Sequence, residues 1–119
     1  NVELIIMAGW MRIVTNTLIS RYQDRIINIH PSLLPSFKGI DAIQQALSNG
    51  SLITGCSSHY VKTDVDSGEI IIQAAIKIKE TDDHNSLKRR IQYYEHIILP
   101  MSIAIAGTKF RKSMDKKNE

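Results

Sequence analysis

Residues 28–35 read Asn28-Ile29-His30-Pro31-Ser32-Leu33-Leu34-Pro35, and the rest of the chain is arranged around them. An apolar run ending in Ile26-Ile27 leads into this segment. Side chains two residues apart on a strand point to the same face, so we expect Asn28 and His30 to project together. Pro31 cannot donate to a strand ladder and disfavours helix at His30, so we expect the strand to end there. The pattern predicts an amide and an imidazole at the rim of a sheet, where open α/β sheets place their ligands.

The flanking sequence predicts an α/β fold. Four segments are predicted to be strands: residues 4–8, 25–29, 53–61 and 69–78. Short helices are expected over residues 17–22 and 41–47. The first helix separates two strands, which favours a right-handed parallel unit, and the last two strands predict an antiparallel hairpin. The predicted fold class is therefore α/β, a three-layer sandwich with a mostly parallel sheet.

The end of the chain predicts one long helix. Thr81, Asp82 or Asp83 is expected to cap it, and it is expected to reach about Ala106. Apolar residues at alternating steps of four and three predict its buried stripe: Leu87, Ile91, Tyr94, Ile98, Met101 and Ile105. Pro100 predicts a kink or break near residues 96–99. From periodicity alone, Gln92 and Glu95 are favoured as solvated residues flanking the stripe.

Composition narrows the function classes. The 119 residues are enough for one domain, with 43% hydrophobic residues and a net charge of +3. Much of the basic excess lies in residues 108–119, which we expect to form a solvated tail. Phe110 is the only aromatic residue there, which ranks nucleic-acid binding well below that interpretation. No apolar run approaches the roughly 18–20 residues of a membrane span, and no signal peptide is visible.

Cysteine and histidine usage argues against two further classes of site. Cys56 is the single cysteine, so no internal disulfide can form, and a reducing compartment is expected. We favour a buried inert thiol over a nucleophile. The four histidines lack the spacing to carboxylates or thiols that a zinc site needs: His30, His59, His84 and His96. The first strand begins almost at Asn1, which suggests that the natural protein begins earlier.

Asn28 and His30 are the best candidates for chemistry. The amide can donate to a developing oxyanion, and the imidazole can give or hold a proton near neutral pH. Asp64 or Asp66 could supply an acid that keeps the histidine protonated. Direct transfer to an incoming amine would need no serine or cysteine nucleophile. Spacing alone supports equally well that Asn28 and His30 only satisfy backbone groups at the strand end.

A family resemblance favours the chemical interpretation. Residues 28–39 closely resemble the signature of the formyltetrahydrofolate-dependent formyltransferases. Three further segments match in order: Ala8-Gly9-Trp10-Met11-Arg12-Ile13, Val65-Asp66-Ser67-Gly68 and Gln92-Tyr93-Tyr94-Glu95-His96. The match makes residues 1–107 the C-terminal part of a catalytic domain, followed by a basic tail over 108–119. The family's N-terminal nucleotide-binding βα units, with their glycine-rich phosphate turn, have no counterpart here.

The resemblance implies transfer of a formyl group from 10-formyltetrahydrofolate, as co-substrate, to the primary amine of glycinamide ribonucleotide in purine biosynthesis. Catalysis would fall to Asn28, His30 and Asp66, the last raising the pKa of the histidine and ordering a water. Folate would be contacted by Asn28 and by two loops: Met11, Arg12, Ile13 and Val14, and Lys62, Thr63, Asp64 and Val65. The ribonucleotide would be contacted by Gln92, Tyr93, Tyr94 and Glu95.

The implied protein is a cytoplasmic enzyme of one-carbon metabolism that needs no metal. Its partners would be small molecules, without nucleic acid or membrane, and its oligomeric state is open. Formyltetrahydrofolate hydrolases usually carry a second histidine where this chain has Pro31, and methionyl-tRNA formyltransferases lack the Gln92-to-His96 pattern. Thr63 and Glu69 depart from the residues usual at their positions. The competing interpretation is a truncated, folate-binding but inactive fragment.

Overall fold

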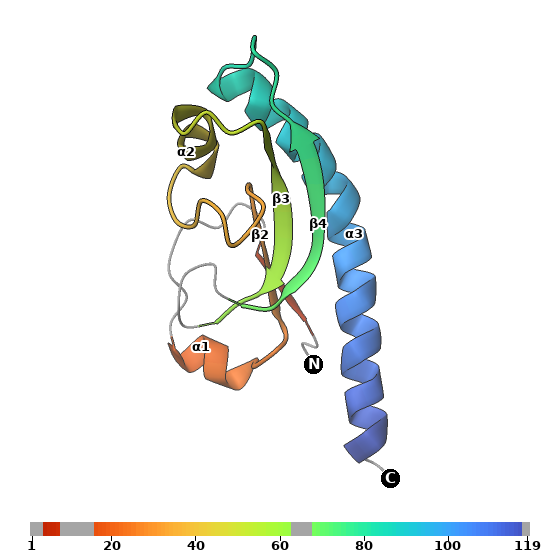
Figure 1. Cartoon of the computed structure of the whole chain (residues 1–119). Coiled ribbons are helices and arrows are strands. Elements are labelled where there is room, and N and C mark those ends of the chain that lie inside the picture. The colour runs from red at the N-terminus through yellow and green to blue at the C-terminus, as the bar shows by residue number, and fades with distance from the viewer. Residues whose placement is uncertain (1–3, 8–15, 63–67, 118–119) are drawn as a thin grey trace.

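The computed structural model describes residues 4–7, 16–62 and 68–117 and has the predicted α/β class (Figure 1). Its four-stranded sheet has the order β1-β2-β3-β4. The strands are β1 (Ile5–Met7), β2 (Ile26–His30), β3 (Ile53–Tyr60) and β4 (Ile70–Lys77). The helices are α1 (Asn16–Arg21), α2 (Ala42–Ser48) and α3 (His84–Lys117). Each of these elements lies within a few residues of its predicted position, except at the end of α3.

The described sheet is mixed rather than mostly parallel. β1 and β2 are parallel, as predicted for strands joined by a helix. β3 pairs antiparallel with both β2 and β4. The connection through α2 brings the chain back to the end of the sheet at which β2 finishes, so β3 runs in the opposite direction (Figure 1). This connection is a return loop rather than a crossover, which the helical pattern of residues 41–47 did not distinguish.

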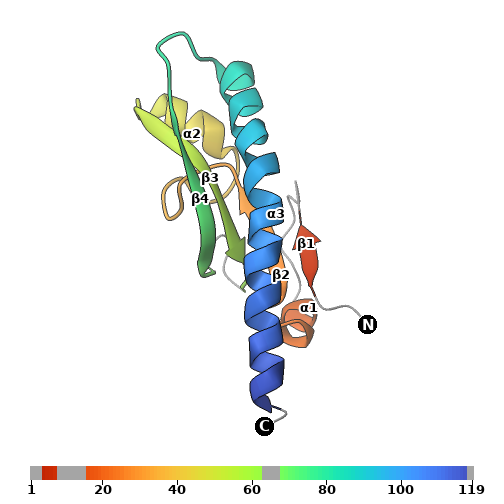
Figure 2. The ribbon, with the colours of Figure 1, turned by 90° about the vertical axis from the view of Figure 1, so that its right-hand side faces the viewer.

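Helices lie on both sides of the sheet, as the three-layer prediction required. In the first two views α3 lies on one side, and α1 and α2 lie on the other (Figures 1 and 2). Ile29, Cys56 and Ile76 from three strands form a core with buried residues that include Leu87 and Ile91 of α3. A second cluster joins Ile27, Tyr60 and Ala106 farther along the helix. The odd-numbered residues of β2 therefore face α3, and its even-numbered residues face away.

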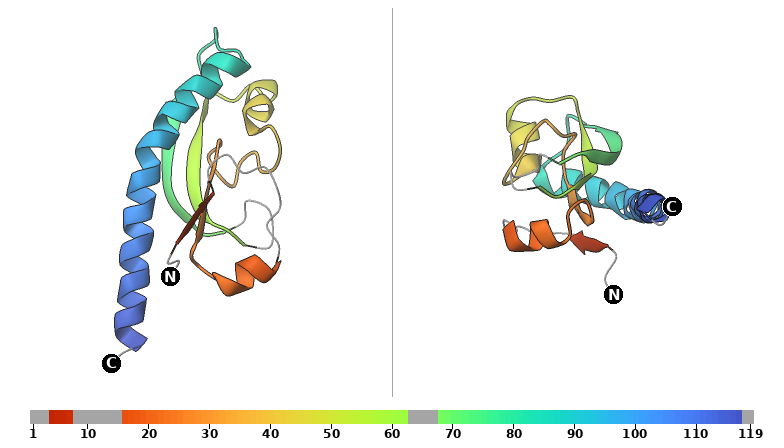
Figure 3. Two further views of the ribbon diagram at one scale, coloured as in Figure 1. Left: turned by 180° about the vertical axis from the view of Figure 1, so that it is seen from behind. Right: turned by 90° about the horizontal axis from the view of Figure 1, so that it is seen from below.

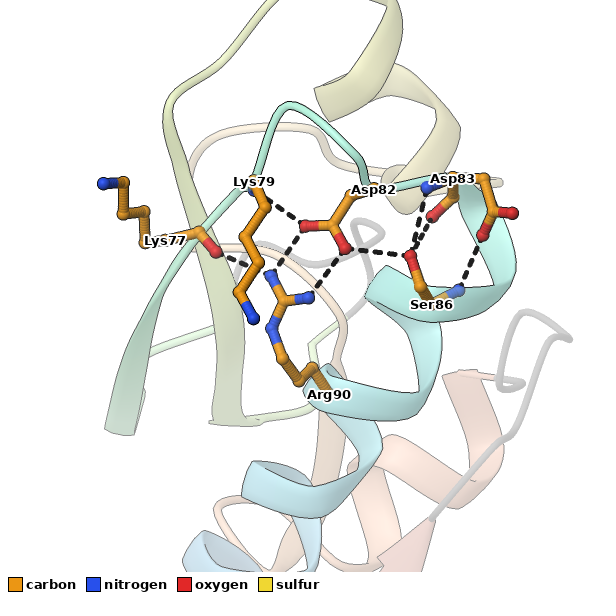
Figure 4. Close-up of polar contacts among 6 residues, drawn as sticks. All are labelled: Lys77, Lys79, Asp82, Asp83, Ser86 and Arg90. Carbon is orange, nitrogen blue, oxygen red and sulfur yellow. Dashed lines mark hydrogen bonds and ion pairs between the residues drawn. The ribbon is translucent and has the colours of Figure 1, made fainter.

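α3 begins at a reciprocal cap. The carboxylate of Asp83 accepts from the backbone N–H of Ser86 at 2.8 Å, and the Ser86 hydroxyl accepts from the N–H of Asp83 at 3.0 Å (Figure 4). These bonds satisfy N–H groups that a helix start otherwise leaves without partners. They confirm Asp83 among the three predicted caps.

The C-terminal half of α3 differs from the prediction in two ways. Of the kink or break predicted near residues 96–99, the break is absent: α3 is continuous through Pro100 to Lys117 and bends along its length (Figure 3). A proline removes one backbone hydrogen bond, and packing on both sides of it maintains the rest. Residues 108–117 are helical rather than a loose tail. Lys109 pairs with Glu69 at 3.3 Å, and Arg25 lies 5.1 Å from the Phe110 ring centroid. Lys109 and Phe110 therefore connect this part of the helix to the rest of the chain.

The buried stripe of α3 also shifts along its length. Leu87, Ile91 and Ile98 are buried as predicted, but three predicted members are exposed: Tyr94 by 37%, Met101 by 52% and Ile105 by 47%. Ser102 and Ala106 are buried in place of the last two. The buried residues there are four apart, at Ile98, Ser102 and Ala106. The small side chains of Ser102 and Ala106 let the helix approach β3 closely. Hydrogen bonding between the hydroxyls of Ser102 and Ser58 marks this approach.

An ion pair joins the hairpin to the start of α3. The carboxylate of Asp82 accepts two hydrogen bonds from the guanidinium of Arg90, each 2.7 Å long, and one from the N–H of Lys79 at 2.8 Å (Figure 4). Arg90 also donates to the carbonyl of Lys77 at 2.7 Å. Arg90, through its hydrogen bonds, is the main cause that holds the pKa of Asp82 well below its usual range.

Replacing Asp82 should therefore make stability less dependent on pH. A depressed pKa means that the unfolded chain binds more protons, so the stabilisation is present above about pH 4 and is lost as the pH falls. We expect Asp82→Asn to lower the melting temperature by a few degrees at about pH 6 and by less at about pH 3. Thermal unfolding followed by circular dichroism measures both values. Asp115→Asn, at an exposed site on the same helix, is the control. Its difference in melting temperature from the wild-type chain should not shrink between about pH 6 and about pH 3.

Candidate active site

β2 presents Asn28 and His30 on the sheet face opposite α3. Asn28 is half-buried, and His30 is 6% exposed. Asn28 lies opposite His59 of β3, and His30 lies opposite Ser57. The prediction that the two side chains share one face is confirmed, because the alternation of β2 turns Ile27 and Ile29 toward the α3 core.

The amide of Asn28 has a defined orientation. Its Oδ1 atom accepts a hydrogen bond from the backbone N–H of Ile29 at 2.9 Å. Only the oxygen of an amide can accept from an N–H, so this bond fixes which end of the side chain is which. The Nδ2 group, with its two N–H donors, is therefore the end of the side chain that can donate to a ligand. Such a donor suits an oxygen on which negative charge develops.

The imidazole of His30 is also oriented by a backbone group. Its Nε2 atom lies 2.7 Å from the carbonyl oxygen of Phe37. A carbonyl can only accept, so Nε2 carries a proton, and in the neutral ring Nδ1 is the unprotonated nitrogen. Phe37 has a φ of 53°, in the left-handed region that is uncommon for a residue with a side chain. The bond to Phe37 therefore orients the ring and assigns the proton to Nε2.

The loop that supplies this carbonyl is fastened to the sheet by two side chains that sequence reasoning missed. Ser57 donates from its hydroxyl to the carbonyl of Ser32 at 2.7 Å, and Gln73 donates from Nε2 to the carbonyl of Leu34 at 2.9 Å. The only signal in the sequence is a polar residue inside each of two strongly β-prone runs. That signal does not say which backbone group each side chain will meet.

Comparisons with known proteins agree with these features. The model of the formyl transferase family matches residues 1–103. The chain belongs to the formyl transferase family. The phosphoribosylglycinamide formyltransferase of Bacillus subtilis is 48% identical over 102 residues, which are 86% of this chain and 52% of that protein. The human trifunctional purine biosynthetic protein adenosine-3 is 40% identical over 108 residues, 91% of this chain and 11% of that protein.

A solved structure in the same family matches the fold. The crystal structure of phosphoribosylglycinamide formyltransferase from Anaplasma phagocytophilum superposes with a TM-score of 0.86 at 44% identity. The match covers 91% of this chain and 53% of that one. The chain therefore spans about half the length of these phosphoribosylglycinamide formyltransferases.

The remaining predicted folate contacts of this formyl transferase family member lie mostly outside the described residues. These are Met11, Arg12, Ile13, Val14, Thr63, Asp64 and Val65, and the predicted catalytic residue Asp66 lies outside as well. Lys62 is described; it is exposed and lies shortly after the end of β3. All of these assignments stay predictions.

The predicted ribonucleotide contacts lie on α3, across the sheet from Asn28 and His30. Gln92, Tyr93 and Tyr94 are exposed, whereas Glu95 is half-buried. Burial raises the pKa of Glu95, and the neighbouring His96 opposes that shift. The helix thus offers a carboxylate at the margin of the core. Whether these side chains meet a substrate stays a prediction.

Two further observations concern the classes of site considered from the sequence. Among residues 4–7, 16–62 and 68–117, no group of three or more histidine, cysteine or acidic side chains is arranged to hold a metal ion. No helix in the same part of the chain is long and apolar enough to cross a membrane.

Cys56 is buried, as predicted for an inert thiol. It has no exposed surface and faces the core between the sheet and α3. Burial raises the pKa of Cys56 to about 12, with a smaller contribution from the negative charge of Glu95. At about pH 8 a thiol of this pKa is ionised in roughly one molecule in ten thousand, and the thiolate is the reactive form.

We therefore expect Cys56 to resist a thiol reagent such as Ellman's reagent in the folded chain. Labelling should be complete in denaturant and at least roughly a hundredfold slower without it. Ser113→Cys, at an exposed position of α3, is the control and should label at once. Rapid labelling of Cys56 in the folded chain would contradict the buried placement.

Proposed function

We propose that this chain carries the formyl-transfer centre of a phosphoribosylglycinamide formyltransferase. The reaction would move a formyl group from 10-formyltetrahydrofolate to the primary amine of glycinamide ribonucleotide. The observation that carries the proposal is the oriented pair on β2: Asn28 has its N–H donors directed away from its own backbone, and the imidazole of His30 is held by the Phe37 carbonyl. Family membership supports it, and a cytoplasmic location is the prediction that accompanies it.

The proposed step is direct attack of the amine on the formyl carbon. A new carbon–nitrogen bond forms, and the carbonyl oxygen becomes an oxyanion that accepts from Asn28 Nδ2 and from protonated His30. Collapse of this intermediate breaks the bond between the formyl carbon and the folate nitrogen. The departing nitrogen takes up a proton, and the incoming amine loses one. No covalent enzyme intermediate is needed.

The rest of the proposed site follows the family resemblance. Asp66 would stand beside His30 and favour its protonated form. The backbone of residues 11–14 and the loop of residues 62–65 would hold the folate, together with Asn28. On α3, residues 92–95 would contact the ribonucleotide.

The decisive experiment measures formyl transfer in Asn28→Ala and His30→Ala. Loss of an oxyanion donor should lower kcat by roughly 100- to 1,000-fold, and loss of the proton donor by roughly 100- to 10,000-fold. Formation of formylated glycinamide ribonucleotide is followed by chromatography with both substrates present. His84→Ala is the matched control, because His84 begins α3, has a side chain that is 39% exposed, and pairs with Asp41.

Three outcomes contradict the proposal. Wild-type rates in Asn28→Ala and His30→Ala would remove their catalytic roles. Release of formate from the folate without the amine would identify a hydrolase. Folate binding without transfer, measured by calorimetry on the same preparation, would favour the folate-binding fragment. The assay is run on the 119-residue chain and on any longer polypeptide that contains it.

The role of α3 has its own test. Glu95→Gln keeps the shape of the side chain but removes its charge, so its contact with the ribonucleotide should weaken. We expect KM for glycinamide ribonucleotide to rise by roughly tenfold while KM for the folate stays unchanged. Steady-state kinetics with each substrate varied in turn separates the two constants. Equal effects on both would show that Glu95 acts through stability instead.

A further inference from the structure

We propose that Ser57 and Gln73 are positioning residues for His30. They hold the loop of residues 31–37 against the sheet, so that the carbonyl of Phe37 keeps the proton of the imidazole on Nε2. Only the catalytic consequence rests on the proposed function; the effect on the imidazole can be measured without it.

The three side chains lie in one row across the sheet. His30 of β2 is paired with Ser57 of β3, and Ser57 is paired with Gln73 of β4. Directly paired residues of antiparallel strands point to the same face. The row therefore lies on the face away from α3, beneath the loop that follows β2. The sheet itself sets the spacing between the histidine and the two residues that hold its loop.

The hydroxyl of Ser57 has all its hydrogen-bonding capacity committed. It donates to the carbonyl of Ser32 at 2.7 Å and accepts from the N–H of Leu34 at 3.0 Å. It also accepts from Nε2 of Gln73 at 3.0 Å. A hydroxyl offers one donor and two acceptor sites, so these bonds saturate it. Ser57 has no exposed surface, so water cannot replace a bond that is lost there.

Gln73 secures the same backbone from the neighbouring strand. Its Nε2 group bonds both the carbonyl of Leu34, at 2.9 Å, and the hydroxyl of Ser57. Gly55, two residues before Ser57, allows the loop to lie close to the sheet. A Cβ atom at Gly55 would come 3.0 Å from a side-chain carbon of Leu33 and 1.9 Å from the carbonyl oxygen of Ala74. The loop is thus held by close packing against the sheet as well as by hydrogen bonds.

Internal bonds carry this restraint to Phe37. The N–H of Ser32 donates to the carbonyl of His30 at 2.9 Å, and the N–H of Ser36 donates to the carbonyl of Leu33 at 3.0 Å. The hydroxyl of Ser32 bonds the carbonyl of Ser36. Residues 32–36 therefore form one compact turn, and fixing its first half places the carbonyl that follows. Loosening that half should lengthen the bond between Phe37 and His30.

The test follows the Nε2 proton of His30 by NMR in Ser57→Ala and Gln73→Ala. In the wild-type chain this proton should exchange slowly with water, and the ring ¹⁵N shifts should report the Nε2–H tautomer at a pH where the ring is neutral. Both variants should exchange at least roughly tenfold faster and show mixed tautomers. Ser57→Thr keeps the hydroxyl and should restore slow exchange.

Ser58→Ala is the matched control. Ser58 is the next residue of the same strand, is equally buried, and has a hydroxyl that bonds Ser102 on the α3 face. It should destabilise the chain without changing the exchange of the His30 proton. If Ser57→Ala does not fold, Gln73→Ala carries the test, because the side chain of Gln73 is exposed. Wild-type exchange and tautomer in Gln73→Ala, or the same change in Ser58→Ala, would overturn the proposal.

Kinetics separates this proposal from the proposed function. Where formyl transfer is observed, Ser57→Ala and Gln73→Ala should lower kcat by roughly 10- to 100-fold with little change in either KM. An inactive chain in which both variants still speed exchange would reject the formyltransferase and keep the positioning role. An active chain whose variants keep wild-type exchange and kcat would reject the positioning role alone.

Discussion

The site depends on the hydrogen bond between Nε2 of His30 and the carbonyl of Phe37. A histidine at the end of a strand can rotate and can carry its proton on either nitrogen. A backbone acceptor 2.7 Å away removes both freedoms. This acceptor belongs to a loop rather than to a strand, so its position depends on what holds the loop.

The two faces of the sheet have different roles, because successive side chains of each strand point to opposite faces. On one face, Ile29, Cys56 and Ile76 of three strands pack with α3 and form the core. On the other, polar residues of the same strands carry the candidate site and fasten its loop. Ser57 and Ser58 show the division: they are adjacent and equally buried, yet one binds the loop of residues 31–37 and the other binds the helix. Packing on the α3 face therefore holds in place the strands that carry the candidate site on the other face.

α3 ties distant parts of the chain to this sheet. Its first turns join the hairpin through the pair of Asp82 and Arg90, and its last turns reach the connection between α1 and β2 through Phe110 and Arg25. Between these ends, small side chains at Ser102 and Ala106 face the strands, while Met101 and Ile105 remain partly exposed. Burial along the helix is thus decided by which residues face the sheet, and only in part by which residues are apolar.

The sequence by itself determined the α/β class, the approximate bounds of most elements, the shared face of Asn28 and His30, and the family. These features depend on local periodicity and on a contiguous motif, and both can be recognised along the chain. Only the tertiary structure decided the direction of β3, the shift of the α3 stripe, the orientation of the Asn28 amide and the acceptor for His30. The direction of β3, the α3 stripe and the role of Ser57 and Gln73 in the loop depend on contacts between residues far apart in the chain. Periodicity does not encode such contacts.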